Sequence, residues 1–167
     1  RVTFLIFRRI FLDNRYKYPF VSEYENVLSK EDCDNLISLF ENEDQIYRNR
    51  PEYKFKEVGI FEASDERLRN IQPQLLKIVN NLVPTYKKEW NIDSFPVKYG
   101  FEGVRIKRYD EGDEFPWHVD VRDYDSARRF LVGMFYLNDH TEFSGGITQF
   151  QLPPEKRNAF LNDLQHL

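Results

Sequence analysis

The segment 104–151 constrains the fold of this chain most, because it alternates short extended stretches with turns. Residues 104, 106 and 108 would lie on one face of a strand, and residues 105, 107 and 109 on the other. Residues 110–114 (DEGDE) predict a turn, and residues 130–137 (FLVGMFYL) form the apolar run typical of a strand buried on both sides. The segment therefore predicts a β-rich core.

A histidine and an aspartate stand two positions apart in this segment. His118 and Asp120 flank Val119, and alternate residues of an extended chain share one face. An imidazole nitrogen and a carboxylate oxygen are two of the three protein donors in the 2-His-1-carboxylate arrangement, which binds Fe(II) and leaves coordination positions open. So short a pattern also arises by chance, and its meaning depends on the residues around it.

The flanking residues follow in a defined order. Tyr109 precedes the pair, and Arg128-Arg129 lead into the apolar run, which ends in residues 136–139 (YLND). Residues 145–150 (GGITQF) come after a polar loop. In this order the residues resemble the Fe(II)- and 2-oxoglutarate-dependent dioxygenases of the prolyl 4-hydroxylase type, and the resemblance covers residues 104–151.

The resemblance implies a fold and an activity. The expected fold is α+β but mainly β, with a double-stranded β-helix (jelly-roll, cupin-like) core at 95–167. Residues 1–94 would supply a strand and supporting helices, so that the chain of 167 residues forms a single domain. The implied enzyme is a dioxygenase that uses Fe(II), 2-oxoglutarate and O2, with ascorbate as a possible reductant. It would hydroxylate a residue, with proline expected, in a peptide or protein substrate.

His118 and Asp120 are the metal ligands that the resemblance implies, and His166 is the expected third ligand. In residues 160–166 an aromatic residue stands six positions before the histidine, as in the family segment that carries the distal ligand. The apolar residues of this segment also fit a helical stripe. His140, in the polar loop, is the alternative donor.

Other roles follow from the same resemblance. Tyr109, Tyr136 and Thr148 match positions that line the cosubstrate pocket. Arg1 opens a strand-like stretch and would pair with the far carboxylate of 2-oxoglutarate if the strand order were circularly permuted. Arg129 matches an arginine that contacts the peptide substrate. Each of these residues also has an ordinary explanation in a strand or at the surface.

Trp117 stands next to the expected ligand His118 and would line the substrate groove or simply pack. Two rival functions remain open. One is a non-catalytic jelly-roll binding module that has kept the scaffold and lost turnover. The other is a different metal chemistry on the same scaffold, which would not need 2-oxoglutarate.

The first half of the chain predicts helices between short extended pieces. Residues 18–28 predict a strand, and Ser29 predicts a helix start with Glu31 and Asp32 in the first turn. The apolar stripe of this helix consists of Cys33, Leu36, Ile37 and Phe40. Residues 45–62 predict loops with short strands. A second helical region covers 64–82, with a kink or break expected at Pro73 and the end near Pro84.

The composition narrows the range of partners. A net charge of -4 provides no overall basic field, so nucleic acid is not expected as a partner. The single cysteine, Cys33, excludes an intramolecular disulfide. The apolar residues within 2–12 are too few to span a bilayer and do not match a signal peptide, which predicts no membrane partner and a cytoplasmic protein. The sequence gives no indication of the oligomeric state.

Overall fold

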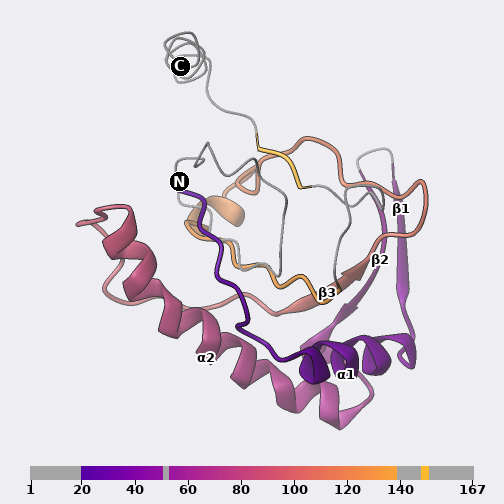
Figure 1. The fold of residues 1–167 in the computed structure, drawn as a ribbon. Helices are drawn as coiled ribbons and strands as arrows, with labels where there is room; N and C mark the ends of the chain where they lie inside the picture. Colours follow the sequence, from indigo (N-terminus) through magenta and orange to yellow (C-terminus); the bar gives the residue numbers. More distant parts are fainter. Residues whose placement is uncertain (1–19, 51–52, 139–147, 151–167) are drawn as a thin grey trace, which may run out of the picture.

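The computed structural model describes residues 20–50, 53–138 and 148–150. Figure 1 shows how its elements are arranged. In chain order they are α1 (Lys30–Glu41), β1 (Ile46–Arg50), β2 (Tyr53–Gly59), the 3-10 helix η1 (Ile60–Glu62), α2 (Glu66–Glu89), β3 (Arg105–Arg108) and the 3-10 helix η2 (Ser126–Arg128).

Helix α1 begins as predicted, because Ser29 and Asp32 form a capping box. The Ser29 hydroxyl accepts the backbone N–H of Asp32 at 3.0 Å, and the Asp32 carboxylate accepts the backbone N–H of Ser29 at 3.3 Å. Three of the four residues predicted for the apolar face, Cys33, Leu36 and Phe40, are buried, and Ile37 is half-buried. Leu39, which was not predicted, is buried as well.

Helix α2 runs without interruption past both prolines, so the break expected at Pro73 and the end expected near Pro84 are wrong. Both prolines are exposed, so the carbonyl groups that lose a helical donor face water. The apolar stripe continues past each proline to Tyr86 and is buried, which outweighs the missing hydrogen bonds. In the part of the chain that the structure describes, neither α-helix combines the length and the apolar character needed to cross a membrane.

Residues 20–28 do not form the predicted strand. Phe20 and Asn26 have φ angles of 62° and 58°, which interrupt the extended backbone. The segment is held on the end of α2 instead. The Tyr86 hydroxyl donates to the carbonyl oxygen of Phe20 at 2.9 Å, and the Ser22 hydroxyl donates to the Glu89 carboxylate at 2.6 Å.

The three strands form an antiparallel sheet in the order β1-β2-β3, which confirms the short strands predicted within 45–62. The register of β2 and β3 sorts their side chains onto two faces. Val58 lies opposite Ile106, and both pack into the core formed with α1 and α2. Glu57 lies opposite Lys107 and therefore on the other face. Figure 1 shows both helices on one side of the sheet.

The core lies between this face of the sheet and the helices. Its largest fully buried side chains are Tyr86, Leu36, Ile60 and Leu68. Ile106 of β3 and Val104, just before this strand, pack against the same cluster. The core therefore fixes β3, and β3 carries the chain into residues 110–138.

Residues 130–137 form no strand beyond a single β-bridge at Phe135 and are half-buried rather than buried on both sides, so the prediction of a buried strand is wrong. The described sheet contains no strand next to this segment that would satisfy its backbone groups. The side chains of this segment still alternate between two sides. Phe135 and Leu137 pack on the core, while Met134 and Tyr136 pack against Val21. Three strands are too few to test the double-stranded β-helix, which stays a prediction.

Candidate metal and ligand site

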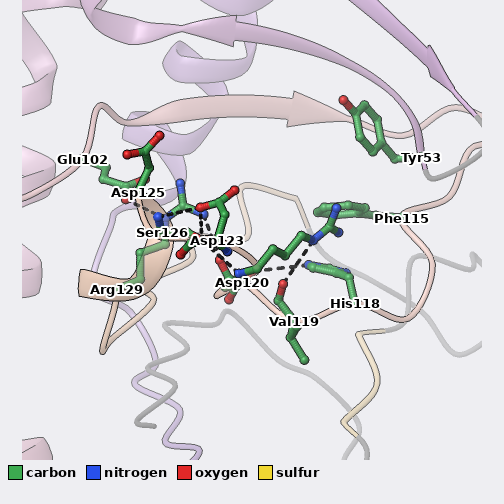
Figure 2. A pocket seen from close by; sticks show the side chains of 11 residues that line it. Tyr53, Glu102, Phe115, His118, Val119, Asp120, Asp123, Asp125, Ser126 and Arg129 are labelled. Atoms are coloured by element: carbon green, nitrogen blue, oxygen red, sulfur yellow. Dashed lines mark hydrogen bonds and ion pairs between the residues drawn. The ribbon is translucent and has the colours of Figure 1, made fainter.

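His118 and Asp120 face each other in the irregular stretch that follows the turn after β3. The His118 Nε2 atom lies 3.4 Å from Asp120 Oδ1, as Figure 2 shows. Two ligands about 2.1 Å from a metal and at right angles lie about 3 Å apart. The two side chains therefore fit adjacent positions on one metal ion with only a small adjustment, as their spacing in the sequence predicts.

The orientation of the imidazole is fixed on two sides. His118 Nδ1 lies 2.8 Å from the carbonyl oxygen of Pro116. A carbonyl oxygen can only accept, so Nδ1 is the donor and Nε2 keeps its lone pair in the neutral ring. The Phe115 ring stacks on the imidazole with the centroids 3.8 Å apart. This arrangement of a backbone acceptor behind a metal-facing nitrogen is typical of histidine ligands.

Two arginines hold the backbone of the His-Val-Asp stretch. The Arg122 Nε atom donates to the carbonyl oxygen of Val119 at 3.3 Å, and Arg129 Nη1 donates to that of Asp120 at 2.9 Å. Arg129 Nε also donates to the Glu102 carboxylate at 2.6 Å, and this contact raises the pKa of the guanidinium. Arg129 therefore positions the carboxylate-bearing residue, while its predicted contact with a substrate stays a prediction.

An open depression of about 420 Å³, lined by both charged and aromatic side chains, lies beside the pair. This volume is in the range of sites that hold small molecules. The lining side chains include the two expected ligands, the two arginines and several acids, and Figure 2 shows most of them around the cavity. Trp117 is 63% exposed and does not belong to the lining set, so its role in a substrate groove stays a prediction.

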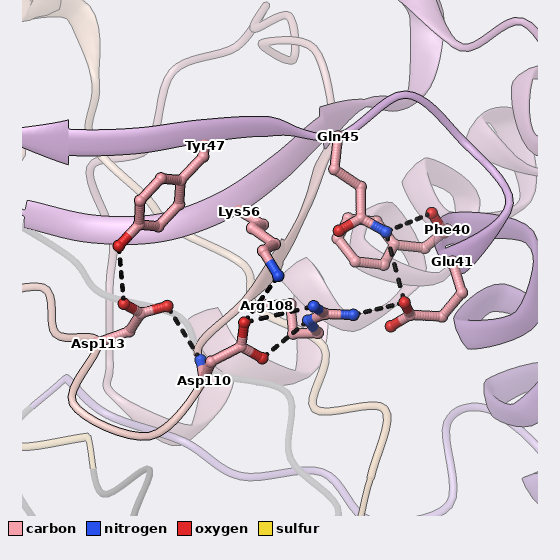
Figure 3. Close-up of polar contacts among 8 residues, drawn as sticks. All are labelled: Phe40, Glu41, Gln45, Tyr47, Lys56, Arg108, Asp110 and Asp113. Carbon is pink, nitrogen blue, oxygen red and sulfur yellow. Dashed lines mark hydrogen bonds and ion pairs between the residues drawn. The ribbon is translucent and has the colours of Figure 1, made fainter.

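The turn that precedes the site is held by polar contacts to the sheet, which Figure 3 shows. The Asp110 carboxylate accepts from Lys56 at 2.8 Å and from Arg108 Nη2 at 3.3 Å, and these contacts lower its pKa. The Tyr47 hydroxyl donates to Asp113 at 3.4 Å. Since the backbone N–H of Asp113 also donates to the carbonyl oxygen of Asp110 at 2.9 Å, the turn closes on itself and directs the chain toward His118.

The residues expected around the cosubstrate lie near one another. Tyr136 and Thr148 share a hydrogen bond between their hydroxyl groups. Burial raises the pKa of Tyr109 to about 12, and the neighbouring Tyr136 and Glu57 add to the rise. Burial also raises the pKa of Tyr136. The structure therefore brings Tyr136 and Thr148 together and places Tyr109 within electrostatic reach of Tyr136.

An aromatic shelf that the sequence did not predict lies between β3 and the His-Val-Asp stretch. Its rings are Phe55 and Phe115, with centroids 5.5 Å apart, and Tyr109 packs on Phe55 at 5.4 Å. The Lys107 ammonium lies over both phenylalanine rings. The alternation of residues 105–109 indicated that Lys107 and Tyr109 share a face, but no pattern indicated which rings would meet them.

The remaining predicted residues, His166, Arg1 and the alternative donor His140, lie outside the described residues. Within the part that is described, no three histidine, cysteine or acidic side chains converge on one point, so the third ligand stays a prediction. Comparison of the chain with known protein families, with curated proteins and with solved structures found no match. The site itself is a His–Asp pair with a fixed imidazole beside an open depression of mixed lining.

Proposed function

We propose that this chain is an Fe(II)- and 2-oxoglutarate-dependent dioxygenase that hydroxylates a residue, most simply proline, in a peptide or protein. The observation that carries the proposal is the geometry of His118 and Asp120. Their donor atoms lie 3.4 Å apart, and the backbone contact at Nδ1 leaves Nε2 of His118 directed at the carboxylate. A nitrogen and an oxygen donor on one side of a cavity suit ferrous iron with open coordination positions.

His118 and Asp120 would hold the iron, with His166 as the third ligand. When bound, iron and cosubstrate supply the oxidation of an unactivated C–H bond by O2, with 2-oxoglutarate converted to succinate and CO2. The contacts of Arg122 and Arg129 hold the backbone at Val119 and Asp120, so that only the side chains of the pair need a small adjustment when the metal binds.

Tyr109, Tyr136 and Thr148 would orient the cosubstrate through their hydroxyl groups. Both tyrosine hydroxyls are protonated at neutral pH, since burial only raises pKa values that already lie well above 7, and each can donate a hydrogen bond to a carboxylate. Exposed apolar side chains beside the cavity suit a peptide substrate: Trp117 is 63% exposed and Tyr124 is 93% exposed. Arg129 would face that peptide, as the family resemblance implies.

The test uses the protein under anaerobic conditions with Fe(II) and 2-oxoglutarate. A weak absorption band in the visible range is expected for the chelated cosubstrate, and His118→Ala should abolish it. After oxygen is admitted, release of succinate should be lost in Asp120→Ala. Asp44→Ala, which changes an exposed acid between α1 and β1, is the matched control and should behave as the wild type does.

Two outcomes would contradict the proposal. Succinate release that persists in Asp120→Ala would remove this residue from the metal site. Metal-dependent binding of 2-oxoglutarate without any succinate would favour the non-catalytic binding module. Thermal unfolding of each variant separates the loss of a ligand from the loss of the fold.

A further inference from the structure

Ser126, the first residue of η2, is a buried serine in an exposed stretch. It is 5% exposed, whereas its neighbours within 122–129 are all exposed. Its hydroxyl accepts the backbone N–H groups of Arg122 at 2.9 Å and of Asp123 at 3.0 Å. The same hydroxyl donates to the Asp123 carboxylate at 2.6 Å, as Figure 2 shows. A hydroxyl has one proton and two lone pairs, so the hydrogen-bonding capacity of Ser126 is completely used to close this turn.

The main chain of Ser126 takes part in the same turn. Its N–H donates to the Asp123 carboxylate at 2.8 Å, and its carbonyl oxygen accepts the N–H of Arg129 at 3.0 Å. The hydrogen bonds from the hydroxyl and the N–H of Ser126 lower the pKa of Asp123, so this carboxylate is charged at neutral pH and accepts both. Ser126 is therefore bound to the backbone of Arg122 through its side chain and to the backbone of Arg129 through its carbonyl group.

These two arginines are the residues that hold the backbone of the metal pair. The Arg122 side chain donates to the carbonyl oxygen of Val119, and the Arg129 side chain donates to that of Asp120. A side chain reaches a given carbonyl oxygen only from a suitable backbone position, so the placement of both guanidinium groups depends on the turn that Ser126 closes. Among the described residues, Ser126 forms no hydrogen bond with Asp120 itself, so its effect on the pair passes through the arginines.

We propose that Ser126 is a positioning residue of the metal site. By fixing Arg122 and Arg129 it keeps the carbonyl groups of the His-Val-Asp stretch in place, and with them the geometry in which His118 and Asp120 bind the ion. The inference rests on the metal site of the proposed function. Residues that orient metal ligands without touching the metal commonly affect its affinity strongly. Here the orienting contacts act on the backbone of the stretch that carries the ligands.

The test measures the affinity for Mn(II), in place of iron, by calorimetry, so that it does not depend on turnover. Ser126→Ala removes the hydroxyl and Ser126→Thr keeps it. Asp123→Ala opens the same turn from an exposed position, so it decides the question if Ser126→Ala does not fold. Ser22→Ala is the matched control, because Ser22 is also a buried serine, at 2% exposure. Its hydroxyl accepts from Trp90 at 2.8 Å and donates to Glu89 at 2.6 Å.

We expect Ser126→Ala and Asp123→Ala to weaken Mn(II) binding by about tenfold, with most of the affinity kept in Ser126→Thr. Ser22→Ala should lose stability in urea and still bind Mn(II) as the wild type does. If Ser126→Ala loses only stability, and Asp123→Ala binds Mn(II) normally, the role of Ser126 is merely structural and the inference is overturned.

A second measurement tests whether the effect passes through the arginines. On the background of Arg122→Gln/Arg129→Gln, Ser126→Ala should weaken Mn(II) binding by less than about twofold, because residues that act through one network are not additive. A tenfold loss that persists on this background would also overturn the inference. A wild type that does not bind Mn(II) would instead contradict the metal site of the proposed function.

Discussion

The helix-covered sheet and the segment 110–138 are held in place by different forces. In the first region the fixed points are apolar side chains, of which Leu68 and Ile60 are 0% exposed. Within 110–138, Ser126 is the only buried residue among those described, at 5% exposure. Its hydroxyl accepts the backbone N–H groups of Arg122 and Asp123 at 2.9 and 3.0 Å. The stretch 110–129, which carries the site, is thus ordered mainly by polar contacts, whereas residues 131–137 also pack on the core.

This difference separates stability from binding. Removing apolar contacts from the core lowers the free energy of unfolding, whether or not a ligand is bound. The site depends on the direction of donor groups, which a single lost hydrogen bond can change. Ligand sites are commonly built on irregular segments that a rigid scaffold supports, and β3 with its neighbours provides that scaffold here.

The largest expected effect is a loss of stability in the helix-covered sheet. Leu68→Ala removes a fully buried side chain from α2 and should lower the free energy of unfolding by about 2–5 kcal/mol. Urea denaturation measures the loss. Affinity for Mn(II) in the protein that stays folded should change by less than about twofold, because distant sites act independently.

Phe61→Ala is the matched control, since this side chain is 74% exposed and its removal should change stability by no more than about 0.5 kcal/mol. A large fall in metal affinity in Leu68→Ala would break the comparison. It would mean that the core determines the geometry of the His118 site more directly than the polar contacts do.

The second expected effect is a loss of metal affinity at the site of His118 and Asp120. Arg129→Gln removes the donors to Glu102 and to the carbonyl oxygen of Asp120, and should weaken Mn(II) binding by about tenfold. Calorimetry gives the affinity, and urea denaturation should show a change in stability below about 1 kcal/mol, because the pair with Glu102 is exposed. Arg128→Gln, at the exposed neighbour, controls for loss of charge. Equal metal affinity in all three proteins would show that Arg129 does not position Asp120.

The sequence predicted the features that depend on neighbouring residues. The helix start at Ser29, most of the apolar stripe of α1 and the shared face of His118 and Asp120 follow from side chains a few positions apart. The hydrogen bond between Tyr136 and Thr148 joins two residues that the family resemblance had assigned to one pocket. Local periodicity and a motif in the right order were sufficient for these.

The features that the sequence missed depend on distant contacts. Pro73 is a helix breaker locally, but the buried stripe of α2 continues past it. Residues 130–137 have the composition of a central strand, yet the described sheet gives them no neighbouring strand. The surroundings of Lys107 depend on Phe55 and Phe115, which come from β2 and from the stretch after the turn. No pattern within one segment can predict a contact between side chains from three separate segments.

The smallest expected effect concerns Arg108, which joins the two regions because it contacts both Glu41 of α1 and Asp110 of the turn, as Figure 3 shows. The hydrogen bond from Arg108 lowers the pKa of Glu41 below its ordinary value. The folded state therefore favours the charged carboxylate, and this stabilisation is present above the unfolded pKa of about 4.3 and is lost as the pH falls through the folded value.

Glu41→Gln should accordingly lower the free energy of unfolding at pH 7 by about 0.2–1 kcal/mol, a small value because the Glu41 side chain is 41% exposed. The difference from the wild type should shrink as the pH falls below about 4.3, and urea denaturation from pH 7 to pH 3 measures it. Glu111→Gln, at an exposed position in the turn, serves as the control. If the wild type and Glu41→Gln lose stability in parallel across this range, Arg108 does not link α1 to the turn energetically, and the two regions are more independent than their shared arginine indicates.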